Sequence, residues 1–332
     1  FATEKAAKKI IKESEGDDFE VIIPSEMEDE HILLPIANVE NIEKLLEFSI
    51  YLKDKKSVNP ISILSVVSNN DEAEINMLKA RSKLESFVKQ ASAFETKVNI
   101  IATIDYNVAS GIARIAKEIM ADIIVLGWPR KVGLIDKIVG EKVNSVLNNT
   151  DKSAYLCHLE RPLELHKRIV VVTPPLAEHE KGFEHWLIKV SKLAQEFTLN
   201  VDFYCDTITE KAIGKAIQHL KLNGTFQFKL FTDWEEFLIL AREINKDDLF
   251  ILISARHGAP SHMNVLDNLP NKLEKHFVSY SRIIIYPQLY NQNHVIERFE
   301  DISAEPLTKG IETIQRIGKR IGGMFKSDDE LH

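Results

Sequence analysis

The chain has few of the residues on which several classes of protein depend. Only two cysteines occur in 332 residues, Cys157 and Cys205, and both lie inside apolar runs typical of strands. We expect them to be buried, reduced thiols rather than a disulfide or a metal pair. Lys and Arg number 42 against 50 Asp and Glu, which gives a net charge of -8 and argues against a nucleic-acid partner.

Long apolar runs and catalytic signatures are also missing. The sequence has no run of roughly 18 apolar residues of the kind that spans a bilayer, and it has no secretory signal. There is no serine elbow, no HExxH pair and no Walker lysine, so we expect a protein that is not an enzyme. Because the first residue is Phe1 rather than Met, we also expect the chain to be part of a longer protein.

Short apolar runs alternate with segments of helical periodicity, and the whole order occurs twice. Near-continuous apolar strands between amphipathic helices indicate parallel sheets covered by helices on both faces. We therefore expect an α/β fold made of two consecutive open five-stranded parallel sheets flanked by helices. The expected divisions are a helical lead-in from a preceding segment (1–30), two domains (31–160 and 161–290) and a tail with a C-terminal amphipathic helix (291–332).

Two segments have surfaces that need a partner. The last strand of each repeat, "SAYLCHL" at 153–159 and "SRIIIYP" at 281–287, would leave an open sheet edge. We expect these strands to pair or to face each other, which would give a body with pseudo-twofold symmetry. In the tail, basic residues surround isoleucines at helical spacing between 311 and 321. That helix either packs on its own domain or docks onto a membrane surface or a partner.

A strand that ends in glycine, a short loop and a helix with two more glycines follow one another in "VLGWPRKVGLIDKIVGE" at 125–141. With "ILLPIA" at 32–37 and "TIDYNVASGI" at 103–112, this pattern resembles the universal stress protein family. The resemblance implies an adenine nucleotide alpha hydrolase-like fold, a five-stranded parallel sheet with crossover helices, and two copies in one chain are common in that family. It covers 31–158 well and 166–287 more faintly.

In the ATP-binding branch of that family, three spaced glycines and a hydroxyl residue form the loop after the fourth strand. Gly127 and Gly140 match the first and third glycines, whereas Arg130 replaces the second and Glu141 replaces the hydroxyl residue. The Arg130 side chain would restrict close approach of the backbone, although its charge could attract phosphate. Glu141 would place a negative charge beside the phosphates. The resemblance therefore implies a degenerate nucleotide crevice.

The remaining candidates lie elsewhere in the same repeat. Ala37 occupies the position of the family's adenine-binding Asp and offers no acceptor, while Asp105 either lines the crevice or caps the next helix. The nucleotide-binding candidates are Ala37, Asn38, Asp105, Gly127, Arg130, Gly133, Gly140 and Glu141. We expect no resident cofactor and no metal, with ATP or AMP as the nucleotides such a crevice would take.

The second repeat is more divergent. Arg256, His257 and His262 could form an anion or metal cluster, but their spacing matches no ligand pattern and favours a plain surface loop. His179 and His185 lie on a polar helix, where we expect both to be solvated.

The opening segment, "FATEKAAKKI", resembles the sequence that follows the last membrane helix of bacterial monovalent cation/proton (Na+/H+) antiporters with long cytoplasmic tails. This resemblance implies a non-catalytic regulatory or assembly domain on the cytoplasmic side of the inner membrane. Its partner would be the membrane-embedded antiporter domain of the same polypeptide, with a small nucleotide and a homodimer as further possibilities. The alternatives are a soluble tandem stress protein that binds ATP or another adenine nucleotide, and a crevice that takes a different ligand such as a cyclic dinucleotide.

Overall fold

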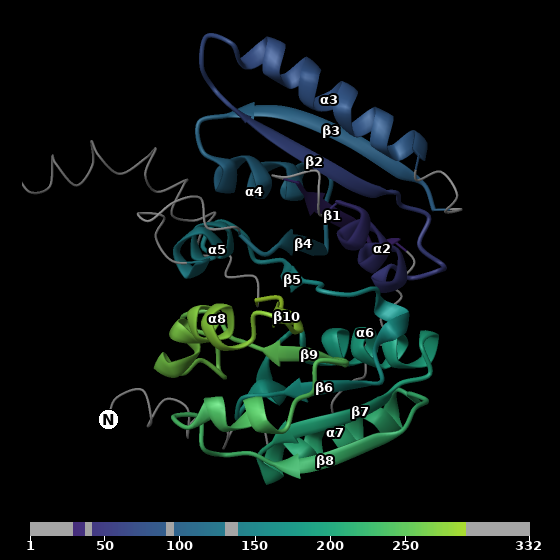
Figure 1. The fold of residues 1–332 in the computed structure, drawn as a ribbon, viewed down its shortest axis with the longest axis vertical. Coiled ribbons are helices and arrows are strands. Elements are labelled where there is room, and N and C mark those ends of the chain that lie inside the picture. Colours follow the sequence, from purple (N-terminus) through teal and green to yellow (C-terminus); the bar gives the residue numbers. More distant parts are fainter. Residues whose placement is uncertain (1–28, 37–41, 91–95, 130–138, 290–332) are drawn as a thin grey trace, which may run out of the picture. The chain divides into compact units, whose positions relative to one another are not determined.

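The computed structural model describes residues 29–36, 42–90, 96–129 and 139–289. These residues form a ten-stranded sheet with helices on both faces (Figure 1). The strands of the first half are β1 (Ile32–Pro35), β2 (Ile61–Ser68), β3 (Val98–Asp105), β4 (Ile123–Gly127) and β5 (Ser153–His158). Those of the second half are β6 (Arg168–Val172), β7 (Asn200–Cys205), β8 (Phe226–Leu230), β9 (Asp248–Ile253) and β10 (Ser281–Tyr286).

Helices connect the parallel strands. The α-helices are α2 (Ile42–Leu52), α3 (Ala73–Gln90), α4 (Val108–Glu118), α5 (Val139–Leu147), α6 (Phe183–Glu196), α7 (Thr207–His219) and α8 (Asn264–His276). Short 3-10 helices are η3 (Leu163–Leu165), η4 (Ala177–His179) and η5 (Phe237–Arg242). None of the helices in this part of the chain combines the length and the apolar character that a membrane span needs.

The two halves have the same topology. The sheet order is β3-β2-β1-β4-β5-β10-β9-β6-β7-β8, so each half runs third, second, first, fourth, fifth strand. Within each half every strand pair is parallel. The first strand of each half therefore separates two oppositely wound connections, and a crevice is expected at the carboxyl ends of the strands there. The expected α/β class is confirmed.

The halves join through their last strands. β5 and β10 pair antiparallel, with Cys157 opposite Ile283 and Leu156 opposite Ile284. The prediction that these strands pair is confirmed, and the prediction of two separate sheets is corrected, because the pairing fuses them into one. Each strand would otherwise leave a row of backbone donors and acceptors exposed, so the pairing removes both open edges. The domain boundaries drawn from the sequence stay predictions.

Both faces of the sheet carry a core that continues across this junction. Alternate residues point to opposite faces, so Ile32 and Leu34 belong to one buried cluster and Leu33 to the other. The first cluster includes residues of α2 and α6, and the second includes residues of α4, α5 and α8. Figure 1 shows α2 and α6 on one side of the sheet and α5 and α8 on the other. Helices of both halves thus share each core.

Some local expectations were wrong or fall outside the described residues. The helical periodicity of "DWEEFLILAREI" at 233–244 predicts an α-helix, whereas η5 is a 3-10 helix whose buried Phe237 and Leu240 lie three apart, the period of that helix. The expected C-terminal helix lies outside the described residues. Of the expected lead-in segment (1–30), only residues 29 and 30 are described. The prediction of free, buried cysteines is confirmed. Burial raises the pKa of Cys205 to about 12 and raises the pKa of Cys157 well above its ordinary value.

Candidate functional site

The structure places only some of the nucleotide-binding candidates. Ala37, Asn38, Arg130 and Gly133 lie outside the described residues, while Gly140 and Glu141 belong to the first turn of α5. Gly127 is the last residue of β4, and a Cβ atom at this position would approach the side chain of Leu45 in α2 to 3.0 Å. Packing against α2 is therefore a sufficient reason for a small residue at this position.

Asp105 lies apart from Gly127. It ends β3, which is separated from β4 by β2 and β1, and three strand spacings amount to about 14 Å. Its carboxylate accepts a hydrogen bond from the backbone N–H of Asn107 at 3.3 Å and pairs with Arg114 at 3.4 Å. The helix cap is Asn107, whose side chain accepts from the N–H of Ala109, so the expectation that Asp105 caps the helix was wrong. Asn at that position, directly before the apolar run, is the signal that could have identified it.

In the second half, a carboxylate of the chain itself occupies hydrogen-bond donors of the loop after β9. This loop follows the fourth strand of its half, as the glycine-containing loop does in the first half. Glu180, which is buried, accepts from the backbone N–H of Ser261 at 3.1 Å and from its hydroxyl at 2.6 Å. Nearby, the Thr209 hydroxyl lies 2.9 Å from carboxylate oxygens of both Glu178 and Asp206. Glu180 therefore occupies both hydrogen-bond donors of Ser261, and acidic side chains surround the Thr209 hydroxyl.

Arg256, in the same loop, forms hydrogen bonds that connect the second half to the first. Only 6% of it is exposed, and its guanidinium donates to the backbone carbonyls of Thr150 and Lys152, next to β5. Burial lowers the pKa of Arg256 to about 10. It is therefore not a free phosphate receptor, and the expectation of a plain surface loop is corrected. Sequence spacing gave no sign of this, because the accepting carbonyls lie more than 100 positions away.

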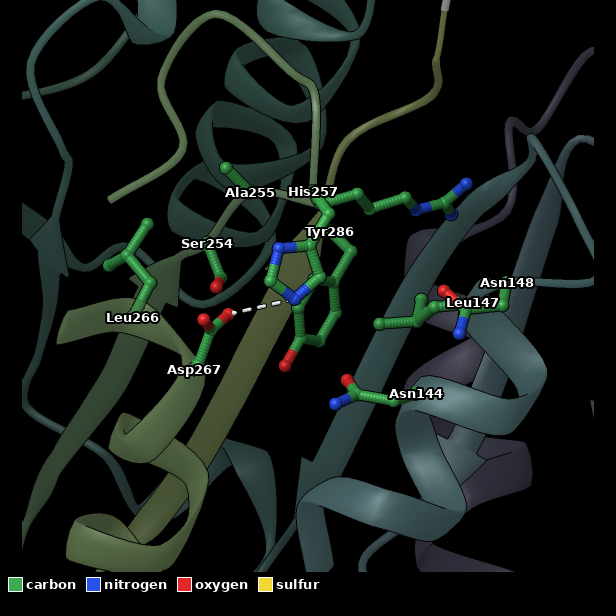
Figure 2. A pocket seen from close by; sticks show the side chains of 10 residues that line it. Asn144, Leu147, Asn148, Ser254, Ala255, His257, Leu266, Asp267 and Tyr286 are labelled. Carbon is green, nitrogen blue, oxygen red and sulfur yellow. Dashed lines mark ion pairs between the residues drawn. The ribbon is translucent and has the colours of Figure 1, made fainter. Parts of the chain in front are cut away.

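A small cavity of about 20 Å³ lies beside this loop. Its lining includes Asn144 from α5, Asn148 directly after that helix, and Ser254, His257 and Asp267 from the second half. Figure 2 shows the α5 side chains on one side of the cavity and His257 with Asp267 on the other. The cavity has room for about one water molecule, so it is too small for a nucleotide.

A second buried cluster joins the start of β1 to α6. The Glu30 carboxylate lies 2.5 Å from the ammonium of Lys189 and 3.2 Å from Nε2 of His185. Burial raises the pKa of Glu30, but the hydrogen bond from His185 and the charge of Lys189 outweigh it and lower the pKa to about 2. Lys189 also donates to the carbonyl of Leu52, at the end of α2. The expectation that His185 is solvated was wrong, whereas the His179 side chain is 53% exposed.

Comparison with known proteins agrees with this topology. Residues 30–158 match the model of the universal stress protein family. The fold is universal stress protein-like. A universal stress protein from Archaeoglobus fulgidus superimposes with a TM-score of 0.54 at 16% identity, covering 79% of this chain and 97% of that protein. Because that share exceeds residues 30–158, the likeness of fold extends into the second half.

Two transport-related proteins are also similar. The cytoplasmic domain of a prokaryotic cation chloride cotransporter superimposes with a TM-score of 0.50 at 15% identity, covering 77% of this chain and 95% of that domain. The Na(+)/H(+) antiporter NhaS5 of Synechocystis sp. is 29% identical over 132 residues, which are 38% of this chain. The alignment covers 19% of the antiporter, so this chain corresponds to a minor part of that protein's length.

Proposed function

We propose that this chain is a non-catalytic regulatory or assembly region of a membrane cation:proton antiporter, placed on the cytoplasmic side of the inner membrane. The observation that carries the proposal is the 132-residue alignment with the NhaS5 antiporter. The similarity in fold to the cytoplasmic domain of a cation chloride cotransporter supports it. The partner is then the membrane-embedded domain of the same polypeptide, which carries out the exchange itself.

Within this proposal, Glu30 is the point where a force from the membrane domain reaches the folded body. Residues 1–28 would lead from the membrane to Glu30, which lies two residues before the start of β1. Because Glu30 is held by Lys189 and His185 of α6, a displacement there acts on both halves together. The β5–β10 pairing makes these halves one sheet. The chain would therefore act as a stiff platform rather than as two independently moving domains.

The same proposal includes a nucleotide crevice that has lost its function. In the second half, Glu180 holds the N–H and hydroxyl of Ser261, groups that would otherwise be available to an anion. In the first half, Arg130 and Glu141 stand where the ATP-binding branch has a glycine and a hydroxyl residue. A soluble tandem stress protein that binds an adenine nucleotide is the alternative outcome of the tests below.

The direct test is the full-length gene. We expect the coding sequence upstream of Phe1 to encode a series of apolar membrane helices, and an upstream start codon with no such helices would overturn the proposal. The complete antiporter is then compared with a version that ends before residue 29 and so lacks the folded region. The assay uses inverted membrane vesicles and measures how fast a pH gradient collapses when Na+ or K+ is added. Truncation should retain exchange but alter its dependence on pH or cation, or its assembly. Unchanged dependence and assembly would refute a regulatory or assembly role.

Nucleotide binding is tested separately, on the 332-residue chain. A ligand that binds only the folded state raises the unfolding midpoint, by about 2.7 kcal/mol of stability at 100 times its Kd. We expect ATP, ADP and AMP to leave the midpoint unchanged up to millimolar concentrations. A clear rise with any of them would favour the adenine nucleotide-binding alternative.

A further inference from the structure

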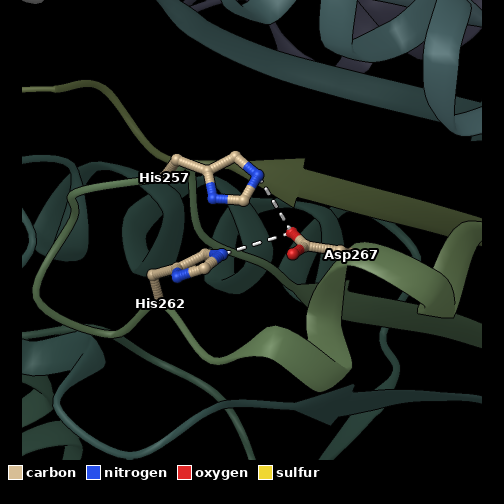
Figure 3. Close-up of side chains that lie close together, drawn as sticks. All are labelled: His257, His262 and Asp267. Atoms are coloured by element: carbon tan, nitrogen blue, oxygen red, sulfur yellow. Dashed lines mark hydrogen bonds and ion pairs between the residues drawn. The ribbon is translucent and has the colours of Figure 1, made fainter.

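Three metal-ligating side chains converge at the carboxyl end of β9. His257 and His262 lie in the loop after β9, and Asp267 lies in the first turn of α8 (Figure 3). The Nε2 atoms of His257 and His262 lie 3.5 and 3.2 Å from Oδ1 of Asp267. All three potential ligand atoms lie within 4.8 Å of one another. The sequence alone gives no sign that Asp267 lies beside the two histidines, because Asp267 belongs to the next helix.

These separations fit a single bound ion. Nitrogen and oxygen ligands bind Zn2+ at about 2.1 Å, so two ligands of a tetrahedral site lie about 3.4 Å apart. The two nitrogen-to-oxygen distances in the cluster, 3.5 and 3.2 Å, lie on either side of that value. The imidazole rings are tilted by 48° with centroids 4.4 Å apart, so they are not stacked on each other. The two imidazole ligand atoms lie within 4.8 Å of each other, so they would approach by at most about 1.4 Å to reach the spacing of a tetrahedral site.

The cluster is accessible to an ion from solvent, and there is room beside it for a further ligand. The His257 side chain is 68% exposed, so an ion can reach it from solvent, whereas the His262 side chain is 15% exposed and held in place. His257 and Asp267 line the 20 Å³ cavity, which has room for about one water molecule as a further ligand. The neighbouring charge of Arg256 is engaged elsewhere, on the carbonyls of Thr150 and Lys152.

We propose that His257, His262 and Asp267 bind one divalent transition-metal ion, with Zn2+ as the representative, and that water completes its coordination. Two imidazoles with one carboxylate favour Zn2+ and similar ions, whereas Mg2+ and Ca2+ prefer oxygen ligands throughout. The ion ties the loop after β9 to α8, next to α5 of the first half. This site is independent of the antiporter proposal, because it depends only on residues of the second half.

The test is Zn2+ binding by the 332-residue chain, measured by titration calorimetry and by the metal retained after dialysis. We expect one Zn2+ per chain and no competition from MgCl2. His257→Gln and Asp267→Asn should each weaken binding at least about 100-fold, since groups that merely support a ligand are already worth 10- to 100-fold. His276→Gln is the matched control, because His276 is an exposed histidine of α8 away from the cluster. It should bind Zn2+ as the unmodified chain does.

The outcomes separate this site from a simple pair of His–Asp contacts. Because His257 is mostly exposed, His257→Gln should keep the metal-free unfolding midpoint, so lost binding cannot be attributed to lost folding. Co2+ should give the visible absorption of a low-coordinate site in the unmodified chain and in His276→Gln, but not in His257→Gln. Absence of Zn2+ binding, or equal binding by His257→Gln and His276→Gln, would overturn the proposal.

Discussion

Replacing Lys189 with Met would leave the carboxylate of Glu30 buried without its nearest cation. The side chains of Lys189 and Glu30 are 1% and 3% exposed, and their charged atoms lie 2.5 Å apart. Breaking a buried pair from one side typically costs about 3–5 kcal/mol. The lowering of the pKa of Glu30 from 4.5 to about 2 corresponds to about 3 kcal/mol at roughly 1.4 kcal/mol per pH unit, a figure that His185 and Lys189 supply together.

The assay is urea unfolding near pH 7, followed by circular dichroism and tryptophan fluorescence. Lys55→Met is the matched control, because Lys55 and Glu196 also pair at 2.9 Å across the two halves but with side chains 77% and 33% exposed. It should cost less than about 1 kcal/mol. The double variant Glu30→Gln/Lys189→Met should be more stable than the sum of its single variants predicts, by about 2 kcal/mol. The reasoning fails if Lys189→Met costs no more than Lys55→Met, or if the double variant is additive.

The same carboxylate predicts a pH dependence. The pKa of Glu30 is lower in the folded chain, about 2, than its ordinary value of 4.5. The folded state therefore binds the proton less readily, so the stability that Glu30 contributes is complete above about pH 4.5 and is lost as the pH falls toward 2. Comparing unfolding midpoints at pH 6 and pH 3 for the unmodified chain and Glu30→Gln isolates this part. Equal acid sensitivity of the two would contradict it.

Further variants test the packing and the joined sheet. Gly182→Ala should lose about 1–3 kcal/mol because its Cβ would lie 2.7 Å from a backbone nitrogen after β10, whereas Gly214→Ala, with open space around its Cβ, should gain up to about 1 kcal/mol in urea unfolding. Ile283→Cys should form a disulfide with Cys157 on oxidation, because these residues face each other across β5 and β10. Intact mass should fall by two hydrogens, and Ile284→Cys, on the opposite face, should show no such loss; the reverse result would refute the register.

The sequence was sufficient for the parts of the fold that depend on local patterns. Apolar strands between amphipathic helices predicted the duplicated α/β order, and the open edges of the last strands predicted their pairing. The family resemblance implied a five-stranded parallel sheet with crossover helices in each half, and the structure supplies the order of the strands. What could not be predicted depends on contacts between distant residues: Glu180 meets Ser261 at a separation of 81 positions, and Glu30 meets His185 at 155. A residue such as His185 looks solvated in a helical pattern until the partner is known.

The loop after β9 is held by contacts within the protein, and their energies indicate what a nucleotide phosphate would have to displace there. A phosphate that displaced Glu180 would have to replace two hydrogen bonds to a buried carboxylate, each worth about 1.5–3 kcal/mol. The resulting cost of about 3–6 kcal/mol would weaken nucleotide binding by a factor of roughly 100 to 10,000. Arg256, the remaining cation of that loop, is held by carbonyls of the first half. In this half an anionic ligand therefore competes against the protein's own contacts, whereas a cation at His257, His262 and Asp267 would replace only the contacts of the two histidines with the Asp267 carboxylate.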